Sequence, residues 1–215
     1  MPTYVQIQTY ATCGRRTLRD VLRRYQEVLT RLGCEDAQVL DWFSHISWPV
    51  SDDDPFGDIY AAPVTLVPAH NERIDCAGIE VSLYPQPALP SVEELPSWLG
   101  FSLLFDVAEL KANIVEPYEP EVGYVLWHIL CELAMEFSEA GTYFTDEWQE
   151  NRSWRAVVEN VGDPWAFDLG LFPRRLASHF VTVPAGYKGT VLDGAFGFAQ
   201  ANRWQVLPWT QDEQR

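Results

Sequence analysis

The stretch from Glu121 to Trp148 constrains the fold of this chain more strongly than any other part of the sequence. Between Val122 and Phe137, apolar side chains recur at three- and four-residue spacing, which is the period of an α-helix. Tyr124 and Trp127 widen the apolar surface beyond a single stripe, and such a helix is covered on more than one side. We therefore expect a long, buried helix over residues 121–140 at the centre of the core.

Both ends of this helix carry sequence signals. Pro120 stands where proline is favoured at a helix start, and the carboxylate of Glu121 suits the positive end of the helix dipole. Gly141 supplies the left-handed conformation that commonly ends a helix. Residues 142–148 are rich in β-branched and aromatic side chains, so a strand is predicted to follow directly.

The rest of the chain alternates between strand-like and helix-like patterns. Residues 4–9 alternate apolar and polar side chains, which predicts a half-buried strand. Residues 15–32 carry apolar side chains at helical spacing, which predicts an amphipathic helix. Further strands are predicted within 37–48, 59–67, 74–84, 100–107, 165–172 and 180–183, with a short helix at 152–160 and a C-terminal hairpin that turns at 200–203. We expect an α+β protein of mainly antiparallel sheets packed by two long helices.

Four prolines within residues 85–97 predict a linker, because proline removes backbone donors and stiffens the chain. The linker would divide the chain into an N-terminal half, 1–84, and a C-terminal half, 98–215, built on helix 121–140. Packing of both halves as a single domain remains an alternative. The N-terminal half is predicted to run strand, helix, strand over residues 4–9, 15–32 and 37–43. The C-terminal half is predicted to repeat this order over residues 100–107, 121–140 and 142–148. Two tandem β-α-β-type halves are therefore a hypothesis.

The charge of the chain excludes some classes of partner. It holds 31 acidic residues against 15 basic ones, a formal net charge of −16. This balance opposes binding to nucleic acid or anionic lipid, whose phosphates need Lys and Arg. It is compatible with a basic protein partner, and also with no role beyond solubility. No apolar run reaches the roughly 18 residues of a membrane span, and the N-terminus has no signal-peptide pattern, so we expect a cytoplasmic protein. The oligomeric state stays open.

The four cysteines indicate neither a metal site nor a disulfide framework. They are spread along the chain and form no C-x-x-C pair. Reduced thiols are the expected state, and no metal or other cofactor is predicted.

One polar line crosses the predicted central helix. His128, Glu132 and Glu136 stand four residues apart and therefore share a helix face. Such a line could supply metal ligands or proton-transfer groups if further ligands converged on it. The interpretation that we favour is the solvated edge of an otherwise buried helix.

Two regions are predicted as an interaction surface. One is the segment after Gly141, where aromatic and acidic residues meet. The other is the polar face of the first helix, which could dock an acidic partner, clamp onto the acidic body of the same molecule, or simply face solvent. The candidate residues are Tyr143, Asp146, Glu147 and Trp148 in the first region and Arg15, Arg19 and Arg23 in the second.

No sequence motif identifies a catalytic site. The chain lacks G-x-S-x-G, a P-loop and G-x-G-x-x-G. The function that we expect is therefore a non-catalytic binding protein with an acidic surface that engages a protein partner, as immunity proteins and secretion chaperones do; this comparison is an analogy only. Alternatives are a small-molecule-binding domain with an aromatic-lined cavity between the halves, and a hydrolase that uses the acidic cluster after Gly141.

Overall fold

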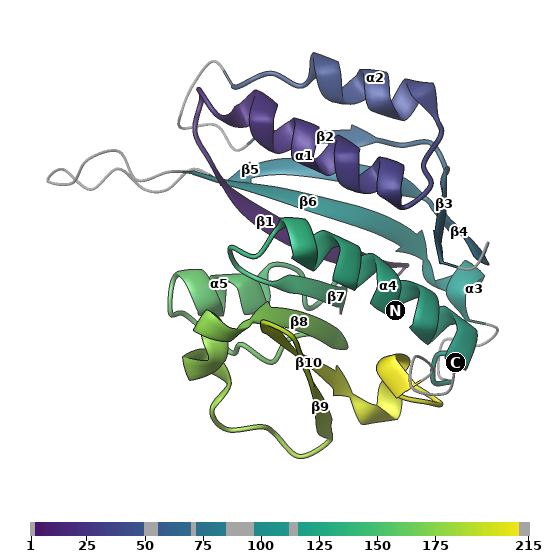
Figure 1. Cartoon of the computed structure of the whole chain (residues 1–215), viewed down its shortest axis with the longest axis vertical. Coiled ribbons are helices and arrows are strands. Elements are labelled where there is room, and N and C mark those ends of the chain that lie inside the picture. The colour runs from purple at the N-terminus through teal and green to yellow at the C-terminus, as the bar shows by residue number, and fades with distance from the viewer. Residues whose placement is uncertain (1–2, 50–55, 70–71, 85–96, 112–115, 211–215) are drawn as a thin grey trace, which may run out of the picture.

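The computed structural model describes residues 3–49, 56–69, 72–84, 97–111 and 116–210. It confirms the α+β prediction: an eight-stranded antiparallel sheet, in the order β2-β5-β6-β1-β7-β8-β10-β9, packs against helices (Figure 1). The strands of this sheet are β1 (Tyr4–Cys13), β2 (Phe56–Tyr60), β5 (Gly78–Tyr84), β6 (Ser97–Asp106), β7 (Thr142–Asp146), β8 (Leu169–Pro173), β9 (Tyr187–Leu192) and β10 (Ala195–Gln200). A separate two-stranded sheet pairs β3 (Val64–Ala69) with β4 (Glu72–Cys76).

Three longer helices cover one face of the large sheet: α1 (Leu18–Arg31), α2 (Ala37–His45) and α4 (Pro120–Glu136) (Figure 1). The shorter helices are α3 (Val107–Leu110), α5 (Arg152–Val158) and the 3-10 segments η1 (Arg174–Phe180) and η2 (Ala201–Arg203). Because side chains alternate along a strand, Val5 and Ile7 of β1 point to the helices, whereas Tyr10 points to the other face. Each face has its own apolar cluster.

Helix α4 is the central buried helix that the sequence predicted. It contacts α1 as well as strands β1, β3, β7 and β8, which explains why its apolar surface extends around most of its circumference. The helix ends at Glu136, four residues before the predicted end, because Phe137 leaves helical geometry. Gly141 does adopt a left-handed φ of 89°, at the start of β7 and against the ring of Phe172.

The predicted strand within 37–48 is wrong, because residues 37–45 form helix α2. The carboxylate of Asp36 accepts a hydrogen bond from the backbone N–H of Gln38 at 2.8 Å, which caps the helix start. Val39 and Phe43, four residues apart, are the two buried residues of the helix. These two positions have helical spacing, and they belong to the apolar cluster beneath α1.

Two predictions near the C-terminus are also wrong. Residues 180–183 do not form a strand, since the 3-10 segment η1 ends at Phe180. The terminal hairpin turns at Asp193 and Gly194 rather than at 200–203, and it joins β9 to β10. Gly194 has a φ of 75°, a conformation that glycine adopts without steric cost, which places the tight turn there.

Strands from both predicted halves belong to one sheet. Strand β1 from the N-terminal half lies between β6 and β7, and both of these come from the C-terminal half. Of the predicted linker 85–97, residues 85–96 lie outside the described residues, and Ser97 begins β6. The division into halves and their duplication stay predictions. No helix in the described ranges is long and apolar enough to cross a membrane.

Candidate functional site

The predicted polar stripe on α4 lies against helix α1. Arg24 of α1 pairs with Glu136 at 2.9 Å and with Glu139 at 3.2 Å, and Arg31 pairs with Glu132 at 3.1 Å. His128 lies edge-on to the ring of Tyr124, with the ring centroids 4.4 Å apart. The two glutamates of the stripe therefore take part in an ionic clamp between α1 and α4.

The predicted arginine face of α1 is divided between different contacts. Arg19 donates a hydrogen bond to the carbonyl oxygen of Ser44 at 2.7 Å, which ties α1 to the end of α2. Arg23 pairs with Asp20 at 3.2 Å on the open surface, where such a pair contributes little stability. Arg15 is exposed before the start of the helix.

The residues predicted after Gly141 serve several structural roles. Tyr143 is buried and donates to the carbonyl oxygen of Ala140, so it does not belong to an exposed surface. Asp146 accepts the N–H of Trp148 at 2.9 Å, which shapes the turn after β7. Glu147 accepts the backbone N–H groups of Thr3 and Tyr4, each at 2.9 Å, and these bonds lower the pKa of its carboxyl. Trp148 is 69% exposed.

A polar region lies beside these residues on the sheet face opposite α1, α2 and α4. Glu80 of β5, Ser102 of β6 and Gln8 of β1 occupy one row across three neighbouring strands. Gln6 and Thr145 are direct neighbours in the next row, across β1 and β7. We call this region, with the turn that lies beside it, the polar sheet face; its residues are Gln6, Gln8, Glu80, Ser82, Ser102, Thr145, Glu150 and Asn151.

Hydrogen bonds hold the floor of the polar sheet face in place. The side-chain oxygen of Gln8 accepts the hydroxyl of Thr145 at 3.1 Å, and its side-chain nitrogen donates to Ser102 at 3.4 Å. The side-chain oxygen of Asn151 accepts from the hydroxyl of Tyr10 and, at 3.2 Å, from that of Tyr84. Asn151 itself has a φ of 57°, an uncommon value that these surrounding bonds maintain.

Two carboxyl groups give the polar sheet face its charge. Burial raises the pKa of Glu150, and repulsion from the carboxylate of Glu80 raises it further. Glu80 accepts the hydroxyl of Ser82 at 2.6 Å. No described Lys or Arg forms an ion pair with either glutamate. Asn151 donates a hydrogen bond to Glu150 at 3.2 Å, which partly offsets the rise in pKa, but no described cation balances the two carboxylates.

The sequence contained only part of the signal for this region. The alternation of residues 78–84 places Glu80 and Ser82 opposite the apolar positions of β5, so their common face was predictable. The turn that carries Glu150 and Asn151 has no periodicity, and its position over β1 depends on tertiary contacts. Neither residue was therefore among the predicted site residues.

A second polar cluster is buried between the sheet and the C-terminal segment. Asp168 is 1% exposed and accepts from Arg203 at 2.7 Å. Lys111 donates to the carbonyl oxygen of Glu116 at 2.8 Å and lies 3.8 Å from the ring centroid of Tyr118. Burial, with repulsion from Arg203, lowers the pKa of Lys111 to about 8. The contacts of this cluster join the C-terminal segment to the sheet.

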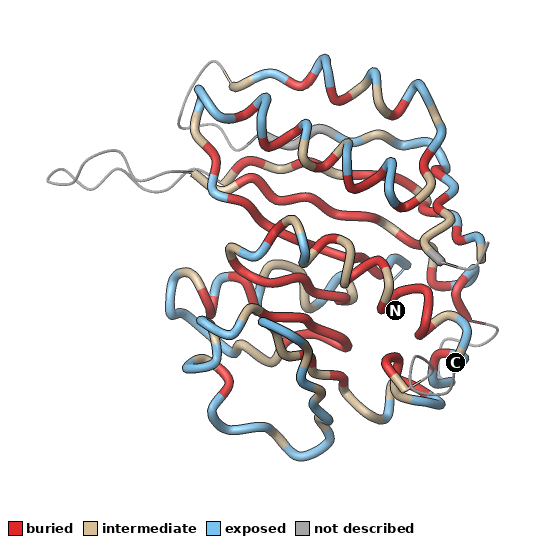
Figure 2. Tube along the Cα trace, in the orientation of Figure 1, coloured by how far each residue is buried: buried red, intermediate tan, exposed pale blue. Residues whose placement is uncertain are grey.

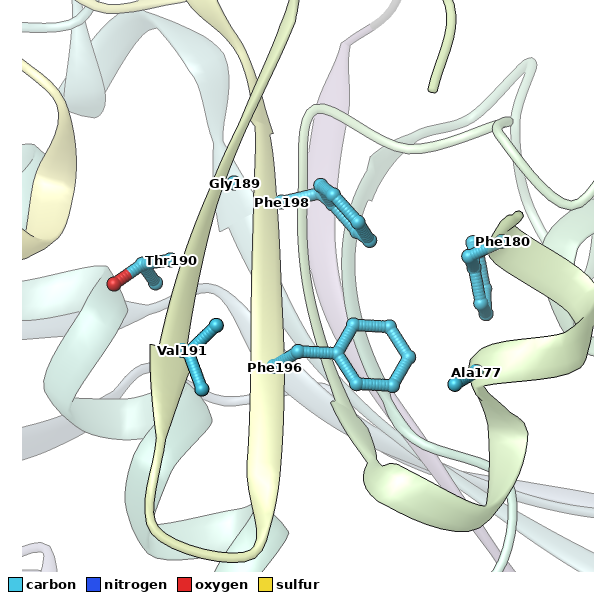
Figure 3. Close-up of a pocket in the computed structure, with 7 residues that line it drawn as sticks. All are labelled: Ala177, Phe180, Gly189, Thr190, Val191, Phe196 and Phe198. Atoms are coloured by element: carbon cyan, nitrogen blue, oxygen red, sulfur yellow. The ribbon is translucent and has the colours of Figure 1, made fainter. Parts of the chain in front are cut away.

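Two hollows on the surface are apolar. One, of about 320 Å³, lies between the C-terminal end of α4 and the strands β8 and β10, and exposed Met135 lines it. The other, of about 230 Å³, lies on the β9–β10 hairpin beside η1, and the rings of Phe180, Phe196 and Phe198 face it (Figure 3).

Within the described ranges, no group of three or more His, Cys, Asp or Glu side chains could hold a metal ion. Comparison of the chain with protein-family models, with curated proteins and with solved structures found no match.

Proposed function

We propose that this protein is a non-catalytic binding protein that engages a basic protein partner at the polar sheet face. The observation that carries the proposal is the half-buried carboxyl group of Glu150, which is repelled by Glu80 and has no ion-pair partner among the described residues. A guanidinium or ammonium group of a partner would relieve this repulsion and favour the ionised form of Glu150.

The surroundings of the two glutamates support recognition of a protein surface. The hydrogen-bonded floor is fixed before binding, which reduces the entropy lost when a partner docks. Trp148, in the same turn as Glu150, exposes a large aromatic surface, and tryptophan is enriched where interfaces bind most strongly. The net charge of −16 would attract a basic partner from a distance.

The cysteines are compatible with action in the cytoplasm, which is part of the proposal. Cys13, Cys34 and Cys76 are buried and form no disulfide. Burial raises the pKa of Cys13 to about 11, which keeps that thiol protonated and unreactive at neutral pH.

The proposal predicts that binding depends on Glu80 and Glu150 together. The tagged protein, purified from its native host at low salt, should recover a specific basic protein, and the Glu80→Gln/Glu150→Gln variant should lose it. We expect the dissociation constant of the purified pair to rise by about tenfold or more for the variant, because two charge contacts are removed. Titration calorimetry measures this change.

A matched control separates a local site from the effect of net charge. The Glu27→Gln/Glu109→Gln variant removes the same number of charges at exposed positions of α1 and α3. It should retain the partner. Equal recovery of the partner by both variants would overturn the proposed site, and recovery of no basic protein by the wild type would overturn the proposed function.

A further inference from the structure

Strand β9 is the last strand at one end of the large sheet. Its partner on the inner side is β10, and no described strand pairs with the other side. Three of its six residues are exposed and none is buried, and the strand lies at the lower margin of the molecule in Figure 2. Unpaired strand edges are templates for pairing with another chain.

The register of the hairpin shows which backbone groups point outward. The tight turn pairs Leu192 with Ala195, and the N–H of Ala201 donates to the carbonyl oxygen of Gly186 at 2.8 Å. Because the bonding direction alternates along an antiparallel strand, even-numbered residues of β9 direct their backbone groups to β10. Gly189 and Val191 therefore direct theirs away from the molecule.

These two outward positions have complementary shapes. Gly189 has no side chain, and the ring of Phe198 occupies the space next to it. Val191 is 75% exposed, although it is apolar. Both residues line the 230 Å³ hollow, on the face to which Phe196 and Phe198 also point (Figure 3). The edge thus carries an apolar projection two residues from an apolar recess.

The charges at the ends of β9 have opposite signs. Lys188 is exposed near its start, and Asp193 is exposed in the turn just after its end. Suppose that two β9 strands pair antiparallel about a two-fold axis through Thr190. Lys188 of each copy then lies opposite Leu192 of the other copy, and next to Asp193 of that other copy. A register that placed Lys188 of one copy opposite Lys188 of the other would bring two like charges together, which destabilises a strand pair.

We propose that β9 is a self-association edge, at which a second copy of this chain adds its own β9 in the register centred on Thr190. Val191 of each copy then lies opposite Gly189 of the other, and its side chain covers the ring of Phe198. Each of these two cross-pairs can exchange two backbone hydrogen bonds. The two sheets join into one. This inference goes beyond the proposed function and uses the opposite end of the sheet.

The first test uses the outward N–H of Val191. Sedimentation velocity of the wild type should show a monomer–dimer equilibrium, with more dimer as protein concentration rises. Val191→Pro removes the N–H and should be monomeric at every concentration, because proline is tolerated on the open side of an edge strand but cannot donate. Val191→Thr keeps the N–H and a β-branched side chain, and it should still dimerise. A wild type that is monomeric throughout would overturn the proposal.

Hydrogen exchange locates the interface. The amide protons of Gly189 and Val191 should exchange more slowly at concentrations that favour the dimer, whereas that of Thr190, already directed to β10, should change little. A dimer in which the exchange of Gly189 and Val191 does not depend on concentration would contradict pairing at β9.

A charge exchange tests the register even if the proline variant fails to fold. Lys188→Glu places two acids together across the interface and should weaken the dimer by about tenfold. Asp193→Lys should weaken it similarly by placing two lysines together. The double variant Lys188→Glu/Asp193→Lys restores opposite charges and should dimerise like the wild type. A double variant as weak as the single ones would refute this register.

Discussion

Glu147 and Glu150 are neighbours in one turn, yet their surroundings shift their pKa values in opposite directions. Backbone N–H groups of Tyr4 and Thr3 lower the pKa of Glu147, whereas burial and Glu80 raise that of Glu150. Because the pKa of Glu150 is higher in the folded protein than in the unfolded chain, ionisation of this carboxyl destabilises the fold. The free energy of unfolding therefore falls as the pH rises from the unfolded to the folded pKa of Glu150. Glu150→Gln should therefore increase the unfolding midpoint at pH 7, on the order of 2 °C.

The neighbouring residue provides the control of opposite sign. The lowered pKa of Glu147 contributes stability above its unfolded pKa, and this is lost as pH falls through its folded pKa. Glu147→Gln should thus lower the midpoint at pH 7, and the difference from the wild type should vanish in acid. Thermal unfolding followed by circular dichroism measures both. Shifts of the same sign at pH 7 would contradict this account.

A binding residue that reduces stability fits the role proposed for Glu150.

At the scale of elements, the clamp between α1 and α4 should contribute measurable stability. Arg24 is partly buried, bonds Glu136 and Glu139, and lies 4.4 Å from the ring centroid of Phe137. Arg24→Met should lower the free energy of unfolding by about 1–2 kcal/mol, because Glu139 loses its ion pair with Arg24 and Glu136 keeps only the longer one to Arg31, at 3.8 Å. A double-mutant cycle with Glu136→Gln, measured by urea unfolding, should give a coupling energy of about 1 kcal/mol.

The exposed pair on the same helix is the matched comparison. Arg23 and Asp20 are both about two-thirds exposed, and Arg23→Met should change the free energy of unfolding by less than about 0.5 kcal/mol. An equal cost for the two substitutions would show that burial of the clamp has no energetic role.

At the scale of the molecule, the position of β1 predicts how the chain folds. The C-terminal half contributes β6 and β7, but the strand between them comes from the N-terminal half. A fragment of residues 98–215 should therefore lack stable tertiary structure, since removal of β1 exposes two apolar strand edges in its core. Near-UV circular dichroism of the fragment should show no fixed aromatic environment.

Addition of the fragment 1–84 provides the complement to this experiment. The two fragments together should recover the near-UV signal of the whole chain, because β1 can then pair with both neighbours. Independent folding of the fragment 98–215 would instead support two separate domains and contradict a single cooperative sheet.

Local patterns determined those parts of the structure that depend on residues close in sequence. The helical spacing around Trp127 defined α4, and the alternation in residues 78–84 defined both faces of β5. Local pattern was insufficient at residues 37–45. Asp36 caps a helix there, and Val39 and Phe43 pack into the apolar cluster that α2 shares with α1.

Tertiary structure alone decided the partners of the charged groups. The helical spacing placed Glu132 and Glu136 on one face of the predicted helix, but nothing in the sequence indicated which charged groups would lie beside them or beside Glu150. Packing of α4 against α1 placed Arg24 beside Glu136, whereas the turn after β7 placed Glu150 near Glu80 without a described cation. A carboxylate's role depends on what lies within a few ångströms of it in space, because charge interactions weaken with distance and with exposure to water.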